Sequence, residues 1–391
     1  SWYLRNPEYR SRVQKLVQSA FAGKPEDIIS QSVAKALYGE VSPYSATRLE
    51  RFAACAFAHF LQYGMKLTER VEYEFKPMDM GNVMHEALES FAEEVRKRGM
   101  KWTELTEQER NEIADRCLDN IVADYGNTVL KSSARNEYMI ERTRRILRRT
   151  VWALQKQLEQ GEFQPEGFEV TFGGGRIDRV DIMEDQNKVY VKVIDYKTGN
   201  TSFDLVYLYH GLQLQLMIYL DGALRVEQKK YPDKEIIPAG VFYYNIKDPM
   251  IQEKIDADVE AVSAGLMKEL KMNGLVQADP ELVYRMDSSL GSIPVAFNKD
   301  GSFRKNSSVA DRTQFAVLGR YVRTKIEKIR SSILEGDAEV SPYELGKKNA
   351  CTYCPYMTVC GFDRRLSGYE FRRLKNFSDE ELWKAFDREA E

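Results

Sequence analysis

The chain has 391 residues, of which 43% are hydrophobic and 30% charged, and its formal net charge is −3. This composition is typical of a globular protein with a sizeable core, and the near-neutral charge argues against a nucleic-acid partner recognised through overall charge. No apolar run is long enough to span a bilayer, and the five cysteines are too few for a secreted disulfide framework. We therefore expect a cytoplasmic protein without a membrane partner, and the opening residues suggest a fragment of a longer chain.

The first 165 residues or so are expected to be helical. Apolar residues recur every three or four positions near 6–22, 25–38, 45–62, 79–98, 105–124 and 135–160. In the third of these segments Ser45 is placed as the N-cap, and Gly64 follows the last turn.

The last of these helices, with the residues just before it, is unusually basic. Residues 131–156 carry six more positive than negative charges, and the apolar stripe through Leu147 and Val151 leaves the arginines facing outward. A phosphate backbone would suit this surface, which makes Arg142, Arg145 and Arg149 candidate nucleic-acid contacts. The alternative is a solvated helix face.

Between residues 168 and 247 the apolar period changes to two, which predicts strands. They are "RIDRVDIM", "KVYVKVIDYKTG" and "IIPAGVFYYNIK", with residues 184–187 as the turn between the first two. We expect a helix from Leu205 to Leu224, further helices at 251–271 and 310–335, a hairpin around Asp300-Gly301 and a helical tail. The fold class is α+β, a small mixed sheet surrounded by helices.

The strand "KVYVKVIDYKTG" places Asp195 and Lys197 at the end of an otherwise apolar face. If residues 184–187 close a hairpin, Asp178 lies opposite about residue 193 and therefore close to Asp195. Two neighbouring carboxylates repel each other, and a hard cation such as Mg²⁺ relieves the repulsion. Lys197 could then orient a water or stabilise charge on a phosphate. The alternative is a surface hairpin with an Asp–Lys ion pair.

Two helical pairs could complete this site. His85 lies off the apolar stripe of its helix and one turn from Glu89, so both could face a common site, although a lone histidine is more often structural. Gln215 and Tyr219 lie four apart on an apolar helix and could position a nucleic-acid strand, or form the polar edge of a packed face.

Three of the five cysteines, Cys351, Cys354 and Cys360, lie within ten residues. Their spacing favours a metal site or a redox pair, and a tetrahedral metal site would be one ligand short. Of the other two, Cys117 lies among helix-forming residues and is expected to be a buried thiol.

Taken in order, these motifs resemble a known family. Gly81, His85, Leu88 and Glu89, then Gly175 to Asp178, then Asp195-Tyr196-Lys197, then Gln215 and Tyr219 follow the order seen in RecB-like nucleases of the PD-(D/E)xK superfamily. The segments "YSATRLERFAACAFAHF", "CTYCPYMTVCGFD" and "GYEFRRL" resemble the C-terminal nuclease domain of AddB/RexB, a component of bacterial AddAB-type helicase–nucleases. This resemblance covers about residues 40–375.

The resemblance implies a restriction-endonuclease-like core at 166–300, between a helical part at 42–165 and C-terminal helices with a cysteine cluster at 301–391. Residues 1–41 would continue from a helicase-like region outside this chain. By resemblance, His85, Asp178, Asp195 and the carbonyl of Tyr196 would bind Mg²⁺ or Mn²⁺. Lys197 would be the catalytic lysine, and Gln215 and Tyr219 would steady the DNA strand. The short stretch between Phe172 and Arg176 departs from the family pattern and leaves Glu169 undecided as an outer carboxylate.

The resemblance also implies that Cys55 is the fourth ligand of a [4Fe–4S] cluster with Cys351, Cys354 and Cys360. The family commonly has CPF at this position, whereas this sequence has CAF, and zinc is the chemical alternative.

The implied function is a metal-dependent DNA exonuclease that resects double-strand breaks for recombinational repair. Its partners would be an AddA/RexA-like helicase–nuclease subunit and a DNA single strand fed from a duplex end, and it would cut the 5′-terminated strand. Two alternatives remain: a DNA-end-binding module with a degraded active site, and a related iron–sulfur nuclease of CRISPR adaptation or of DNA replication.

Overall fold

The computed structural model describes residues 2–20, 28–39, 44–68, 77–124, 134–173, 175–251 and 258–390. The chain divides into two compact units, and each is described here by itself. The first comprises Ser1–Glu69, Val206–Leu212 and Thr324–Trp383, and the second comprises Arg70–Leu205, Gln213–Arg323 and Lys384–Glu391. The predicted boundary between residues 41 and 42 lies outside the described residues.

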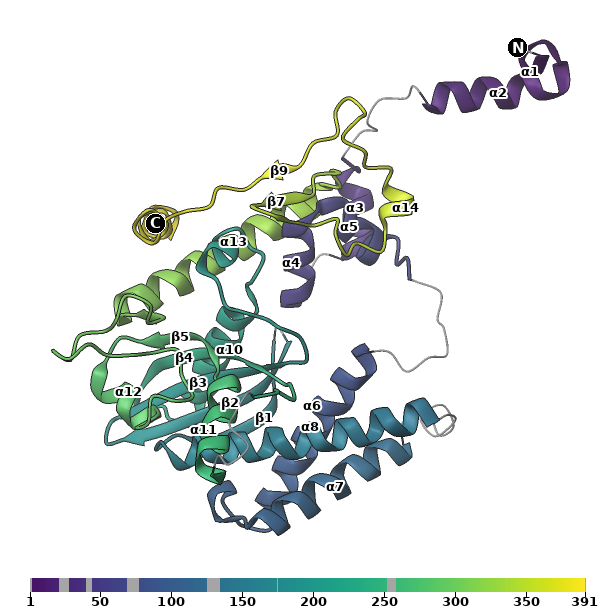
Figure 1. The fold of residues 1–391 in the computed structure, drawn as a ribbon. Coiled ribbons are helices and arrows are strands. Elements are labelled where there is room, and N and C mark those ends of the chain that lie inside the picture. Colours follow the sequence, from purple (N-terminus) through teal and green to yellow (C-terminus); the bar gives the residue numbers. More distant parts are fainter. Residues whose placement is uncertain are drawn as a thin grey trace. The chain divides into compact units, whose positions relative to one another are not determined.

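The second unit is built on a mixed sheet (Figure 1). Over the residues that the structure describes, its six strands lie in chain order: β1 (Gln164–Phe172), β2 (Gly175–Asp185), β3 (Lys188–Lys197), β4 (Glu235–Asn245), β5 (Asn273–Gln277) and β6 (Val309–Ala310). The first three strands are antiparallel, β3 and β4 are parallel, and β5 is antiparallel to β4. The predicted α+β class with a mixed sheet is confirmed.

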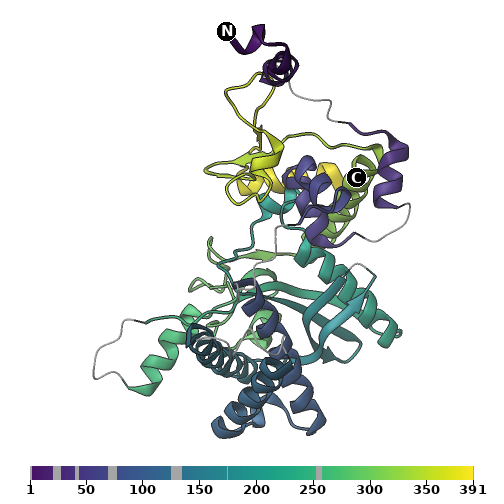
Figure 2. The same cartoon turned by 90° about the vertical axis from the view of Figure 1, so that its right-hand side faces the viewer.

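Helices cover both faces of this sheet. Apolar residues of α6 (Pro77–Lys97), α7 (Glu107–Asp124) and α8 (Ala134–Glu159) form one core with alternate residues of β3, among them Phe91, Leu154 and Ile194. Helix α10 (Gln215–Lys230) packs against β3 and β4, and its Gln215 bonds Lys197, which lies on the other face of β3 from Ile194. Figure 2 shows the dark-blue helices α6–α8 together on one side of the sheet. Buried on both faces, β3 is the central strand.

The β2–β3 hairpin has a tighter turn than predicted. Asp185 pairs with Lys188, so only residues 186 and 187 form the turn, and Val180 lies opposite Val193. The expectation that Asp178 lies opposite about residue 193 is wrong, because the shorter turn shifts the register by two residues. Continuing the observed pairing places Asp178 directly across from Asp195.

The predicted helix from 205 to 224 is two helices. Helix α9 (Leu205–Tyr209) ends two residues before Gly211, whose φ of 77° is in the left-handed region that favours glycine. Apart from Leu205, helix α9 belongs to the first unit. The second unit contains α11 (Val259–Glu269), α12 (Pro280–Met286) and the predicted hairpin, in which Phe297 pairs with Phe303. The helix predicted over 251–271 is thus observed from residue 259, and residues 252–257 lie outside the described part.

The first unit is mostly helical. Besides α9, its described helices include α1 (Trp2–Arg5), α2 (Pro7–Ala20), α3 (Gln31–Tyr38), α4 (Ala46–Ala54), α5 (Ala56–His59) and α14 (Met357–Cys360), with a π-helix at Phe60–Gly64. Ser45 is the N-cap of α4, as predicted, and accepts a hydrogen bond from the backbone of Arg48. The extended backbone of Cys55 separates α4 from α5, which interrupts the single helix expected over 45–62.

The remaining elements of the first unit include a small sheet of β7 (Tyr343–Leu345), β8 (Lys348–Asn349) and β9 (Arg372–Arg373). Helices α13 (Arg312–Glu335) and α15 (Asp379–Ala390) each contribute residues to both units. Within the described ranges, no helix combines the length and the apolar character needed to cross a membrane.

Candidate active site

Three carboxylates lie in a row across β1, β2 and β3. The pairs Phe168–Arg179 and Val170–Ile177 leave Glu169 across from Asp178. The β2–β3 register in turn places Asp178 across from Asp195. Directly opposed residues of neighbouring strands have their Cβ atoms about 5 Å apart on one face of the sheet. The sheet therefore gathers the three acids at one place.

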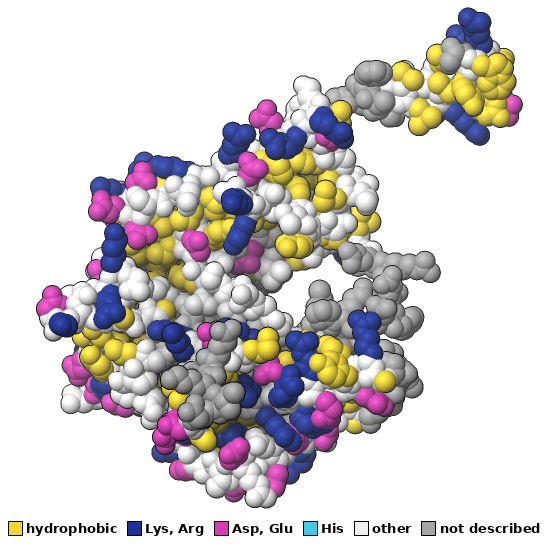
Figure 3. Space-filling view, in the orientation of Figure 1, with side chains coloured by type: hydrophobic (Ala, Val, Ile, Leu, Met, Phe, Trp, Pro, Cys, Tyr) yellow, Lys and Arg dark blue, Asp and Glu magenta, His cyan; other side chains and the backbone are white. Residues whose placement is uncertain are grey.

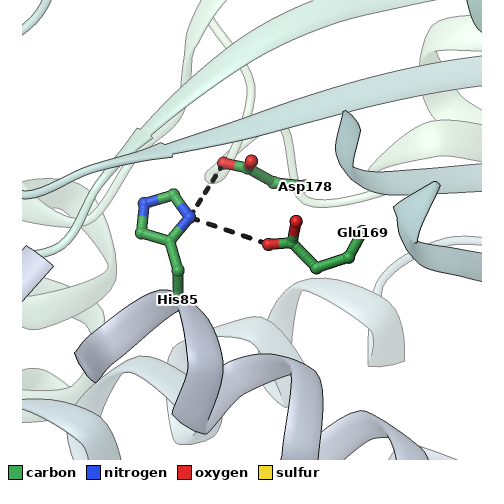
Figure 4. A group of neighbouring side chains, drawn as sticks. All are labelled: His85, Glu169 and Asp178. Atoms are coloured by element: carbon green, nitrogen blue, oxygen red, sulfur yellow. Dashed lines mark ion pairs between the residues drawn. The ribbon is translucent and has the colours of Figure 1, made fainter. Parts of the chain in front are cut away.

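His85 of α6 completes this group (Figure 4). Its Nδ1 lies 3.4 Å from Asp178 Oδ2 and 3.9 Å from Glu169 Oε1. One ligand atom from each of the three residues lies within 4.8 Å of the others, which is close enough for all of them to bind one metal ion. The structure thus brings His85 and Asp178 together, and adds Glu169, which the sequence left undecided.

Glu169 has an unusual backbone conformation for a strand residue. Its φ is 49°, a left-handed value that costs free energy in a residue other than glycine, and such residues cluster at functional sites. Its carboxylate forms an ion pair with Arg176 of β2. The sequence pointed to Glu169 only through the family resemblance, because its place beside Asp178 depends on the β1–β2 register and not on any motif.

Burial, and after it the charge of Asp178, raises the pKa of both Glu169 and Asp195. Burial, and then the charge of Asp178, raises the pKa of Glu169 to about 7, although Arg176 and His85 oppose the shift. Asp195 is only 1% exposed, and burial followed by the charge of Asp178 raises its pKa against the opposing effect of Lys197. Burial lowers the pKa of His85, but its hydrogen bond with Asp178 and the nearby acids outweigh this, so the pKa is raised overall. A crowded acidic site of this kind fits a divalent cation.

A chain of hydrogen bonds holds Lys197 beside Asp195. The Lys197 Nζ lies 2.6 Å from Asp195 Oδ2 and donates a hydrogen bond of 2.8 Å to Gln215 Oε1. Gln215 Nε2 in turn donates to the Tyr219 hydroxyl at 2.8 Å. Gln215 and Tyr219 therefore position the lysine, and their predicted contact with a DNA strand stays a prediction.

This arrangement of a carboxylate strand, a D-x-K strand end and a helical histidine agrees with a comparison to known families. The model of the PD-(D/E)XK nuclease superfamily matches residues 43–361. The chain belongs to this superfamily. Asp195, Tyr196 and Lys197 of β3 supply the D-x-K part of the superfamily's name.

Three relatives of this superfamily member are each named as one subunit of an ATP-dependent helicase/deoxyribonuclease. The protein of Lachnoclostridium phytofermentans is 42% identical over 98% of this chain, and that of Clostridium novyi is 35% identical over the whole of this chain. That of Thermoanaerobacter sp. is 34% identical, also over the whole of this chain. The chain spans only 35% to 36% of the length of these relatives.

Two further residues of the predicted set lie beside the site of the PD-(D/E)XK core. The backbone N–H of Tyr196 donates a 2.7 Å hydrogen bond to Asp178 Oδ2, which orients that carboxylate, while a metal bond from its carbonyl stays a prediction. Glu89 lies close enough to raise the pKa of Glu169, and burial raises its own pKa while Arg176 opposes this. His85 and Glu89 thus face a common region.

The basic helix α8 is partly neutralised by acids of neighbouring elements. Arg144 lies 2.7 Å from Asp119, and Arg145 lies 2.7 Å from Asp248. Arg148 forms an ion pair with Asp115. The net positive charge counted along the sequence is therefore larger than the unpaired positive charge on the surface of α8. Lys131, which was part of that count, lies outside the described residues.

Four cysteines of the first unit line one small apolar cavity of about 20 Å³, and these are Cys55, Cys351, Cys354 and Cys360. Burial and the three neighbouring thiols raise the pKa of Cys351 to about 12. No three of these sulfur atoms lie within 4.8 Å of one another among the described residues, so the predicted cluster stays a prediction. Cys117, at 4% exposure, lies in the core of the second unit, as expected of a buried thiol.

Proposed function

We propose that this chain is the nuclease module of a helicase–nuclease and hydrolyses DNA phosphodiester bonds with a divalent cation. The observation that carries the proposal is the row of Glu169, Asp178 and Asp195 with His85 at one side and Lys197 at the other. The relatives, which are named helicase/deoxyribonuclease, support DNA as the substrate.

The residues that would hold Mg²⁺ or Mn²⁺ are His85, Glu169, Asp178 and Asp195, together with the Tyr196 carbonyl. Oxygen ligands from several carboxylates suit these hard cations. The pKa of Glu169 is raised first by burial and then by the charge of Asp178, and a bound cation would relieve both effects. A bound divalent cation would polarise the scissile phosphate and lower the pKa of an attacking water.

Lys197 provides the chain's own positive charge. Its side chain is 28% exposed, so a phosphate can reach it, while Asp195 and Gln215 fix the position of its ammonium. A preorganised ammonium stabilises the negative charge that develops on a phosphate, because no solvent has to reorganise during the reaction. Asp195 thus has two tasks, holding the lysine and completing the cation site.

The test is cleavage of linear DNA with Mg²⁺ or Mn²⁺ by Asp195→Ala and Lys197→Ala, with the exposed Lys229→Ala as control. Both site variants should lose cleavage with unchanged circular dichroism, while the control cuts normally. Cleavage at the normal rate by both variants refutes the proposal. An unaltered chain that binds DNA ends but cuts with neither metal is instead the end-binding module.

We infer further that the four cysteines of the first unit hold a [4Fe–4S] cluster. Four thiolates around one zinc, each at about 2.3 Å, would have sulfurs about 3.8 Å apart. No three of the described cysteine sulfurs lie within 4.8 Å of one another, so the family resemblance and not a zinc-like geometry supports the choice of a cluster. Such a crosslink between Cys55 and Cys351 would close a loop containing every catalytic candidate and stabilise the fold by several kcal/mol, on the order of a long-loop disulfide.

Visible absorption with iron and sulfide analysis tests this inference. Cys351→Ser should lose the colour and the iron, whereas Cys117→Ser should keep both. A colourless chain with one equivalent of zinc contradicts it.

The cellular setting is proposed from the relatives. A chain similar over its whole length to part of a helicase/deoxyribonuclease would work with an AddA/RexA-like helicase–nuclease subunit in the cytoplasm. There it would resect double-strand breaks for recombinational repair as an exonuclease on the 5′-terminated strand. These relatives favour this setting over the iron–sulfur nucleases of CRISPR adaptation or replication.

A further inference from the structure

A groove of about 760 Å³ is lined by residues of α7, α8 and α11 in the second unit. Among the residues that the structure describes, six arginines and two acids, Glu107 and Glu141, line it. On the face shown in Figure 3, Lys and Arg side chains gather over α8 beside hydrophobic ones. The lining arginines are Arg110, Arg142, Arg144, Arg145, Arg148 and Arg149.

One face of α8 carries both aromatic and cationic side chains along this groove. Tyr138, Arg142, Arg145, Arg149 and Trp152 follow one another at intervals of four, three, four and three residues. These intervals keep all five on one side of a helix, over a length of about 21 Å. An aromatic residue therefore lies at each end, with three arginines between them.

Some of these five side chains already contact other residues of the protein, whereas others are free to contact a ligand. Arg145 is paired with Asp248, whereas no carboxylate partner of Arg142 or Arg149 is found among the described residues. The guanidinium of Arg149 lies 5.7 Å from the centre of the Trp152 ring. Tyr138 is 64% exposed. Two cations and one exposed ring thus remain available to a ligand.

We propose that this groove binds a single strand of nucleic acid, with phosphates on Arg142 and Arg149 and a base stacked on Tyr138. Aromatic rings interleaved with cations along a groove are the general means of holding a single strand without reading its sequence. An acidic protein segment would use the arginines but leave the exposed Tyr138 ring without a base to stack on it. The choice of DNA as the ligand rests on the proposed function, whereas the groove itself does not include the candidate active site.

The test is fluorescence anisotropy of a labelled oligothymidine with the whole chain in EDTA, so that no cation and no cleavage are involved. Arg142→Gln combined with Arg149→Gln should weaken binding about tenfold or more and reduce the slope of log affinity against log salt by about 1.4. Tyr138→Ala, at an exposed position where folding is not at risk, should weaken binding at least about fivefold. The control is Lys229→Gln with Lys299→Gln, which removes two exposed charges outside the groove.

Equal binding by the double arginine variant and the lysine control overturns the proposal, as does a Tyr138→Ala variant that binds normally. If duplex DNA or polyglutamate at equal charge concentration displaces the strand, the proposal is also overturned, because the groove would then bind any polyanion through charge alone. Loss of cleavage in the Asp195→Ala variant with unchanged anisotropy separates this groove from the active site. A chain that binds through the groove but never cuts refutes the proposed nuclease function and leaves this inference standing.

Discussion

Replacing Glu169 by Gln should stabilise the metal-free chain above neutral pH while removing one of the proposed metal ligands. The carboxyl is almost buried, with 8% of its side chain exposed, and its pKa is raised to about 7 by burial and by Asp178. Because the pKa in the folded state lies above that of the unfolded chain, the wild type is most stable below the unfolded value. It loses stability as the pH rises towards 7. Because glutamine carries no charge, the stability of the Glu169→Gln variant should not fall in this way as the pH rises.

The size of the effect follows from linkage. A shift from 4.5 to about 7 costs the ionised form about 3 kcal/mol at most, less whatever surrounding water screens. Most of this cost appears between pH 5 and pH 8. The difference in unfolding free energy, Glu169→Gln minus wild type, should therefore grow across that range by about 2.5 kcal/mol at most, and by less to the extent that water screens the charge.

Urea denaturation in EDTA at pH 5 and pH 8 measures this difference. The matched control is Glu166→Gln on the same strand, whose partner is Lys230 in a half-exposed ion pair and whose gap should not grow with pH. Added Mg²⁺ at pH 8 should stabilise the wild type more than Glu169→Gln, since a ligand that binds only the folded state adds to its stability. A gap that stays constant or shrinks between the two pH values refutes the electrostatic reasoning, whatever the activity of the variant.

Three further predictions concern residues around the two units. Gln215→Leu removes the acceptor that holds Lys197 and should lower kcat about 10- to 100-fold, with DNA binding in EDTA unchanged. His59 is fully buried, and burial and then a neighbouring arginine lower its pKa to about 3. The native state therefore loses about 2 kcal/mol between pH 7 and pH 5, which His59→Gln should abolish in urea titrations. Gly274→Ala would place its Cβ 1.9 Å from the Val241 carbonyl oxygen and should cost about 3 kcal/mol in thermal unfolding.

Each of these has its own contradicting result. A Gln215→Leu variant with normal kcat shows that Lys197 is held by other contacts. If the wild type and His59→Gln are each equally stable at pH 7 and pH 5, the inference that His59 is buried as a neutral imidazole is wrong. Gly173→Ala, where nothing lies within 4 Å of the new Cβ, should be neutral, and equal loss in both glycine variants contradicts the steric argument.

Local patterns predicted much of the fold. The period-two stretch of β3 correctly indicates a strand, and because side chains alternate, Asp195 and Lys197 share a face at its end. The helical spacing of α6 and α8 places their ends within a few residues of those observed. The helix predicted over 205–224 is wrong as a single element, because a left-handed glycine lies within it. That break depends on one φ angle, to which apolar spacing is insensitive.

For the candidate site, too, the sequence predicted one part and the tertiary structure decided the other. By itself the sequence determined which residue types were present and in what order, since His85, Asp178, Asp195 and Lys197 each stand out from an apolar neighbourhood. Only the tertiary structure decided the register, which a two-residue turn set so that Asp178 lies across from Asp195 and Glu169 joins them. It also decided which arginines of α8 are paired with acids far away in the chain. The physical reason is that charge and alternation are local properties of a sequence, whereas strand register and ion pairing depend on residues that only folding brings together.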